Sequence, residues 1–106
     1  APIGWGSEGV IALSDEAKAM LQPGKTLGFN FTCDPSFTWW QIKFISTWWT
    51  TLPSVAVTPD GDDIWDFVQT DTKFEFKLTQ EDINIILEQG LQLVGNGVII
   101  NSVYIL

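Results

Sequence analysis

The stretch that decides the fold runs Phe37-Thr38-Trp39-Trp40-Gln41-Ile42-Lys43-Phe44-Ile45-Ser46-Thr47-Trp48-Trp49, and it holds four of the six tryptophans. Side chains of a β-strand alternate between its two faces, so Trp40, Ile42 and Phe44 are predicted to point into a core. The opposite face carries Trp39, Gln41 and Lys43. An indole there is unusual because a solvated strand face rarely exposes so large an apolar surface.

The two Trp-Trp pairs support a geometric argument. Adjacent side chains of a regular strand point in opposite directions, so a neighbouring pair of indoles cannot both enter the core. We therefore predict that Trp40 is buried and that Trp39 is exposed. Trp48 and Trp49 obey the same rule, but Ser46-Thr47 could form a turn that resets the alternation. The sequence alone leaves open which of these two indoles is exposed.

The remainder of the chain reads as short strands separated by turn signals. Strands are predicted over residues 9–13, 25–33, 54–58, 64–68, 73–78, 91–94 and 98–106. Two short helical segments are predicted, one capped by Ser14 and one capped by Thr79 with Asp82. Gly95-Asn96-Gly97 predicts a tight hairpin turn. This pattern predicts an all-β protein, an antiparallel two-sheet β-sandwich of jelly-roll-like form, with a single domain over residues 1–106.

Composition narrows the possible partners. The chain has a formal net charge of −8, which disfavours nucleic acid and anionic membranes. It has no histidine, so the Ser-His-Asp arrangement and most transition-metal sites are excluded. A single cysteine, Cys33, excludes an internal disulfide and is predicted to be a buried apolar residue. We find neither a signal-peptide pattern nor an apolar run long enough to cross a membrane.

The mixed face of the tryptophan strand suits a sugar. A β-linked glucose ring presents axial C–H groups that lie flat on an indole. Covering some 50–100 Å² of apolar surface in this way contributes roughly 1–2.5 kcal/mol per ring. Gln41 and Lys43 could reach the hydroxyl groups beside a ring stacked on Trp39. The residues themselves therefore predict a flat carbohydrate-binding surface.

Other functions remain open at this point. An exposed aromatic patch with a polar rim also describes a protein–protein interface or a structural domain. A glycoside hydrolase would need paired carboxylates in a cleft that distorts the sugar. We expect no enzyme, because the acidic residues fall mostly in turns and on wet faces. The acidic loop with Asp60, Asp62 and Asp63 is a weak candidate for structural calcium, and no other cofactor is expected.

Several short segments carry a resemblance to a known family. They are Leu21–Leu27, Trp40–Phe44, Trp49–Pro53, Phe76–Thr79, Gly90–Gly95 and Val98–Val103. Together they span nearly the whole chain, which resembles the small β-sandwich carbohydrate-binding modules attached to bacterial β-1,4-glucanases, family eighty-one in particular.

This resemblance implies a non-catalytic, monomeric module of a secreted, extracellular protein. Such modules are covalently linked to a glycoside hydrolase, an endoglucanase, and bind cellulose-type oligosaccharides, mixed-linkage β-glucan or xyloglucan. The positions that could form the binding face here are Trp39, Gln41 and Lys43, with Trp48 or Trp49. Trp5 and Trp65 lie outside the matching segments and are added as further candidates.

Overall fold

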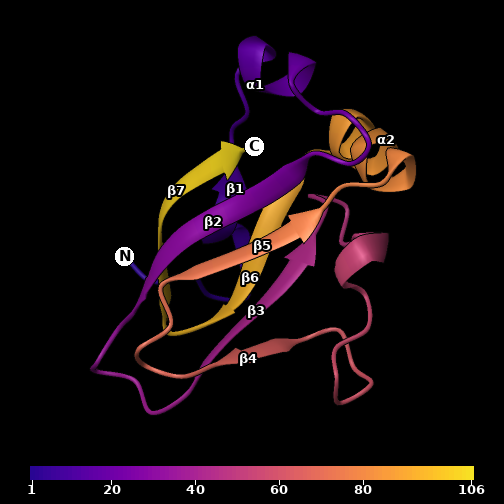
Figure 1. The fold of residues 1–106 in the computed structure, drawn as a ribbon. Helices are drawn as coiled ribbons and strands as arrows, with labels where there is room; N and C mark the ends of the chain where they lie inside the picture. Colours follow the sequence, from indigo (N-terminus) through magenta and orange to yellow (C-terminus); the bar gives the residue numbers. More distant parts are fainter.

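The computed structural model describes all 106 residues and consists of two antiparallel sheets packed face to face (Figure 1). Sheet A contains, in spatial order, β1 (Val10–Ile11), β6 (Leu91–Asn96), β3 (Trp40–Ile45) and β4 (Trp65–Phe67). Sheet B contains β5 (Lys73–Lys77), β2 (Thr26–Cys33) and β7 (Val98–Ile105). The helical segments are α1 (Asp15–Ala19), α2 (Gln80–Gln89) and the 3-10 turns η1 (Ser7–Gly9) and η2 (Pro53–Val55). The predicted antiparallel β-sandwich is confirmed.

The core lies between the sheets and follows the predicted alternation. In β3 the inward residues Ile42 and Phe44 are fully buried, and in β2 the residues Leu27 and Phe29 are as well. The rings of Phe29 and Phe44 meet across the sheets with centroids 5.2 Å apart, and Phe44 also stacks on Phe74 at 5.0 Å. Such aromatic pairs add to the stabilisation that burial provides, so the apolar face of the tryptophan strand anchors the sandwich.

Both predicted helix caps are present. The Ser14 side chain accepts a hydrogen bond from the Ala17 N–H, and Thr79 and Asp82 form a capping box at the start of α2. The Asp82 carboxylate is fully buried and also accepts hydrogen bonds from the backbone N–H and the hydroxyl of Ser54. One carboxylate thus joins α2 to η2.

None of the helices in the structure has the length and apolar composition needed to span a membrane.

Two predicted elements are wrong. Residues 54–58 do not form a strand, because Pro53 begins η2 and the Ser54 N–H bonds to Asp82 instead of a neighbouring strand.

Gly95-Asn96-Gly97 does not form a hairpin turn, because β6 and β7 belong to different sheets. The chain changes sheets at Gly97, where φ is +73° and an added Cβ would lie 2.9 Å from the side chains of Phe37 and Trp40. Glycine is required at this corner by both conformation and space.

The outer face of sheet B is polar and carries one ring. Tyr104 lies across Gly28, where an added Cβ would come within 2.2 Å of the ring carbons. Its hydroxyl donates a hydrogen bond of 2.5 Å to Glu75 Oε2. Desolvation of the phenol, and then the hydrogen bond and charge of Glu75, raise the pKa of Tyr104 to about 12.

This packing predicts an unusual titration. Tyr104 is the only tyrosine, so absorbance near 295 nm follows its ionisation alone, and we expect a midpoint of about 12. Because the folded pKa is raised, the stability that this contact contributes is present below the unfolded pKa near ~10 and is lost as pH rises through the folded value. Glu75→Gln should lower the midpoint. A wild-type midpoint near ~10 would contradict the packing of the ring.

Candidate functional site

The outer face of sheet A carries the mixed side of the tryptophan strand. Trp40 packs against the core, and its Nε1 donates to the Asp34 carbonyl at 2.8 Å, so the adjacent Trp39 is directed outward. The Trp39 side chain is 57% exposed. The Asn96 side chain donates to the Trp39 carbonyl at 2.9 Å, which fixes the backbone at the start of β3. The outward direction of Trp39 is as predicted, and Trp40 packs against the core but is only half-buried.

The second pair lies in a turn. The Ser46 N–H bonds to the Thr50 carbonyl at 2.8 Å, and Ile45 pairs with Thr51, so the chain reverses immediately after β3. Trp48 is 64% exposed and Trp49 is 48% exposed. Both indoles are thus exposed: the turn considered as an alternative at Ser46-Thr47 is present, and strand alternation does not apply in it. Trp49 has φ of +65°, a left-handed conformation that is strained for a bulky residue.

Ser46 organises this turn. Its buried hydroxyl accepts hydrogen bonds from the N–H groups of Trp48 and Thr50, both at 3.1 Å, and donates to Gln89 Oε1 at 2.7 Å. The Thr47 hydroxyl donates to the Gln89 carbonyl. The end of α2 therefore holds the turn that presents both indoles. No sequence pattern predicted this role, because Ser46 and Gln89 are 43 residues apart.

Ser46→Ala should disturb both stability and presentation of the indoles. It leaves the N–H groups of Trp48 and Thr50 without their acceptor, which costs about 1–3 kcal/mol. Denaturant unfolding measures that loss, and quenching by acrylamide reports the altered exposure of the tryptophans. Thr50→Ala is the control, since the Thr50 side chain is exposed in the same turn. Equal stability of the two variants would contradict the role of Ser46.

Trp5 reaches the same side from the N-terminal segment. The Gly4 carbonyl accepts from the Gly95 N–H at 3.1 Å, and the Gly6 carbonyl accepts from Gln92 Nε2 at 2.7 Å. These two bonds hold the Trp5 backbone alongside β6, and its side chain is 46% exposed. These contacts place the Trp5 backbone on the outer side of sheet A, so Trp5 stays a candidate for the site.

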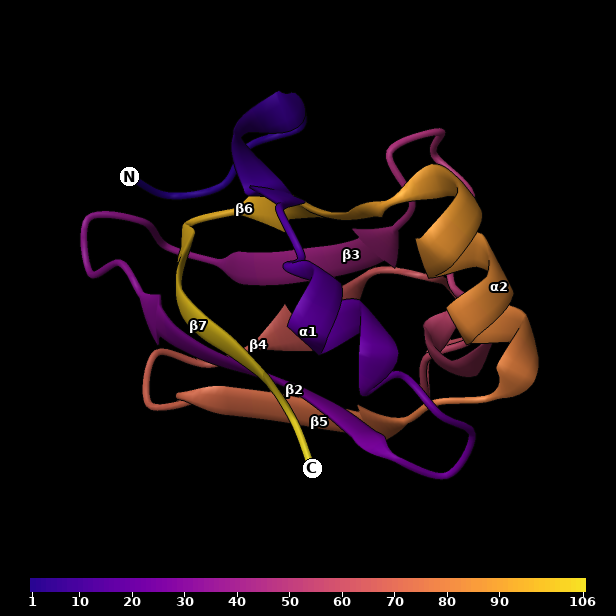
Figure 2. The ribbon, with the colours of Figure 1, turned by 90° about the horizontal axis from the view of Figure 1, so that it is seen from above.

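Three separate segments that carry four exposed indoles thus meet the outer side of sheet A. Figure 2 shows the N-terminal segment and the segment after β3 rising from sheet A on the side opposite sheet B. Trp39 is directed to that side from the start of β3. We call this surface the tryptophan face; it comprises Trp5, Trp39, Trp48 and Trp49.

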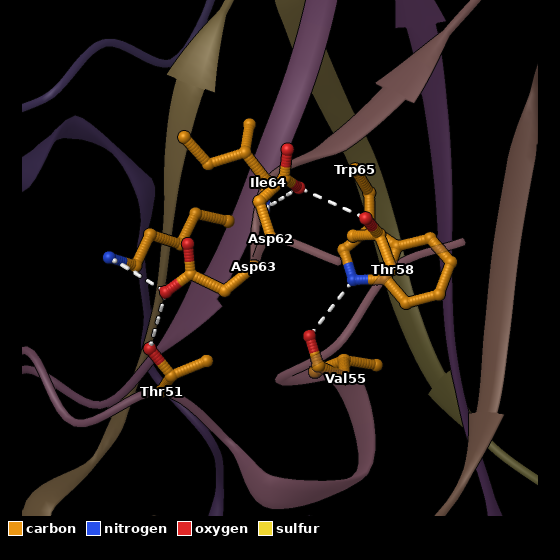
Figure 3. Close-up of polar contacts among 8 residues, drawn as sticks. Thr51, Val55, Thr58, Asp62, Asp63, Ile64 and Trp65 are labelled. Atoms are coloured by element: carbon orange, nitrogen blue, oxygen red, sulfur yellow. Dashed lines mark hydrogen bonds and ion pairs between the residues drawn. The ribbon is translucent and has the colours of Figure 1, made fainter. Parts of the chain in front are cut away.

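The polar groups of the tryptophan face are less free than the sequence suggested. Lys43 Nζ forms an ion pair of 3.1 Å with Asp63 Oδ2, which also accepts from the Thr51 hydroxyl at 3.2 Å (Figure 3). Partial burial opposes ionisation of Asp63, but the hydrogen bond and charge of Lys43 outweigh it, and the pKa of this carboxyl is lowered. Gln41 is half-buried beside this pair on β3. Adjacent donors and acceptors suit the hydroxyl groups of a neutral sugar.

Trp65 does not belong to the tryptophan face. Its Nε1 donates to the Val55 carbonyl at 2.9 Å (Figure 3). It pairs with Ile42 on the inner side of sheet A, and its ring packs on Phe74 with centroids 4.9 Å apart. The residue lines a hollow of about 420 Å³ at the edge formed by β4 and β5. The prediction that Trp65 contributes to the same flat surface is therefore not supported by its position.

The acidic loop does not gather its carboxylates. Asp62 Oδ1 accepts from the Thr58 hydroxyl at 3.0 Å and from the Ile64 N–H at 3.1 Å (Figure 3). Asp63 is directed to Lys43, and no group of three or more acidic, histidine or cysteine side chains in the structure could hold a metal ion. Of the side chains expected to bind calcium, Asp62 thus closes the loop and Asp63 pairs with Lys43 of β3.

Comparisons with known proteins agree with the architecture. No family model and no curated protein sequence matches the chain. Among solved structures, it is similar to SGBP-B of the mixed-linkage glucan utilization locus of Bacteroides ovatus, which was solved in complex with a mixed-linkage heptasaccharide. The TM-score is 0.68 at 22% sequence identity, over 86% of this chain and 22% of that chain. The chain therefore spans less than a quarter of that protein, and the likeness concerns the fold.

Proposed function

We propose that residues 1–106 form a non-catalytic carbohydrate-binding module whose tryptophan face binds a β-glucan chain. The observation that carries this proposal is the exposure of four indoles on segments that rise from, or directly precede a strand of, one sheet of a small sandwich. Exposed rings on this scale are costly in water unless a ligand covers them. Stacking of sugar rings covers them, and the neighbouring Gln41 and Lys43–Asp63 pair offers hydrogen bonds to hydroxyl groups.

The similar structure supports the class of ligand. SGBP-B of Bacteroides ovatus was solved with a mixed-linkage heptasaccharide, and the 22% of it that matches resembles this fold. We extend that ligand class to this chain as a proposal, with mixed-linkage β-glucan, xyloglucan and cellulose-type oligosaccharides as candidates. The sequence resemblance to modules attached to endoglucanases adds the further proposal that an extracellular glycoside hydrolase domain is linked to it.

Electrostatics favour a neutral polysaccharide. The chain carries a formal net charge of −8, which repels polymers of uronic acids or sulfated sugars. The cation nearest the centre of the tryptophan face, Lys43, is already paired with Asp63. A neutral glucan avoids both problems because its hydroxyl groups need only donors and acceptors. Binding should therefore depend weakly on salt concentration.

Affinity electrophoresis against a panel of soluble polysaccharides tests the proposal. We expect mixed-linkage β-glucan or xyloglucan to retard the protein and polygalacturonate to leave it unaffected. Isothermal titration should give dissociation constants between about millimolar and micromolar. Reducing-sugar release from the same glucans should be absent. Retardation by none of the neutral glucans would overturn the proposal, and a ligand-independent dimer in light scattering would favour a protein–protein interface instead.

A further inference from the structure

The exposed indoles of the two Trp-Trp pairs lie at the two ends of β3 and not along it. Trp39 immediately precedes the strand, and Trp48 lies in the turn that follows it. An antiparallel strand rises about 3.4 Å per residue, so the six steps from Trp39 to Ile45 cover about 20 Å. The turn extends beyond Ile45, because Ser46 and Thr50 are bonded to each other and close it at its base. The backbone at Trp39 and the base of the turn are therefore about 20 Å apart along the strand.

The middle of the face is polar and has an indole at its side. The residues of β3 between the two ends contribute Gln41 and Lys43 to the outer surface, and the ion pair with Asp63 lies there. Val94 pairs with Lys43 on the neighbouring strand and is fully buried. Trp5 is held alongside this part of β6 by the bonds of Gly4 and Gly6. A ligand that reaches from one end to the other thus crosses hydrogen-bonding groups between its two stacked rings.

We infer that the tryptophan face recognises a run of about four to five consecutive sugars, and that the ligand chain itself couples Trp39 to the Trp48–Trp49 turn. Residues i and i+2 of a strand are about 6.7 Å apart, a little more than one sugar of an extended chain, so about 20 Å requires three to four intervals between sugars. This inference rests on the proposed function, and it specifies how many consecutive sugars the site binds.

Coupling through the ligand has a distinct consequence. A short oligosaccharide stacks at one end only and gains nothing from the other. Once the chain spans both ends, the second contact becomes intramolecular and multiplies the affinity without any new type of contact. Sugars beyond the span add little, because they extend past the last ring. Affinity should therefore rise in one step with chain length and then level off.

Titration calorimetry with β-1,4-linked glucose oligomers of two to seven units, and with their mixed-linkage counterparts, tests the inference. For the wild type we expect the affinity to rise about tenfold or more between three and five units, and to change less than about threefold from five to seven. Trp39→Ala and Trp48→Ala should each remove the step. Trp5→Ala is the matched control, because it lies beside the middle and should lower the affinity while keeping the step.

The outcomes separate the inference from the proposed function. If the wild type binds polymeric glucan but binds oligomers of three and six units with equal affinity, the inference about ligand length is wrong and the proposed function is unaffected. If Trp39→Ala keeps the step, the two ends are not coupled through the ligand, which also overturns the inference. If the wild type binds no glucan polymer, the proposed function and the inference both fall.

Discussion

Trp39→Ala is expected to weaken binding of soluble β-glucan about 5- to 70-fold, because it removes a stacking contact worth roughly 1–2.5 kcal/mol. The side chain is more than half exposed, and the hydrogen bond that fixes this position is made by the backbone carbonyl. Thermal unfolding should therefore shift by less than about 2 °C. Affinity electrophoresis and calorimetry measure the first effect, and differential scanning calorimetry measures the second.

Tyr104→Phe provides the control for this variant. Tyr104 is an aromatic residue on the outer face of sheet B, away from the tryptophan face, and the substitution keeps its ring while removing the hydroxyl. Glucan binding should be unchanged. If Trp39→Ala binds as tightly as the wild type, the tryptophan face is not where glucan binds. If Tyr104→Phe weakens binding as strongly, the ligand uses sheet B.

Trp40→Ala should produce the opposite result. This indole packs against the core, its Nε1 bonds to the Asp34 carbonyl, and its ring fills space beside Gly97. Deleting a large core aromatic costs about 3 kcal/mol, at the lower end of the usual range because Trp40 is only half-buried. For a domain of this size the melting temperature should fall by roughly 12–24 °C.

Two measurements make the comparison decisive. Trp40→Phe keeps most of the apolar ring and loses the Nε1 hydrogen bond, so it should cost only about 1 kcal/mol. At a temperature where Trp40→Ala remains folded, its affinity for glucan should lie close to that of the wild type. A large loss of affinity with unchanged stability would mean that Trp40 belongs to the binding surface and that the alternation along β3 is misassigned.

The neighbouring tryptophans show which side-chain directions can be predicted from the local sequence pattern and which cannot. Strict alternation predicted which side of β3 enters the core, and the structure places Ile42 and Phe44 there without exception. The same rule could not assign Trp48 and Trp49, because a turn begins at Ser46 and exposes both indoles. That turn depends on Gln89 from the far end of α2, and no local pattern around Ser46 indicates such a partner.

The predicted strand over residues 54–58 and the predicted hairpin at Gly95–Gly97 failed for a related reason. β-branched residues around Val55 favour a strand, but the buried carboxylate of Asp82 accepts a hydrogen bond from the Ser54 N–H and stabilises a 3-10 turn instead. Two glycines around Asn96 are typical of a hairpin, but here Gly97 takes the chain from one sheet to the other. Local propensity is weak beside such tertiary contacts.

The sequence by itself determined the class of fold, the inward face of β3, both helix caps and the outward direction of Trp39. Each of these follows from side-chain periodicity or from a cap residue within four positions, so neighbours along the chain suffice. Only the tertiary structure decided that Trp5 and the Ser46–Thr50 turn join Trp39, that Lys43 is paired with Asp63, and that Trp65 faces inward. Those outcomes depend on which distant segments pack together, and periodicity carries no information about that.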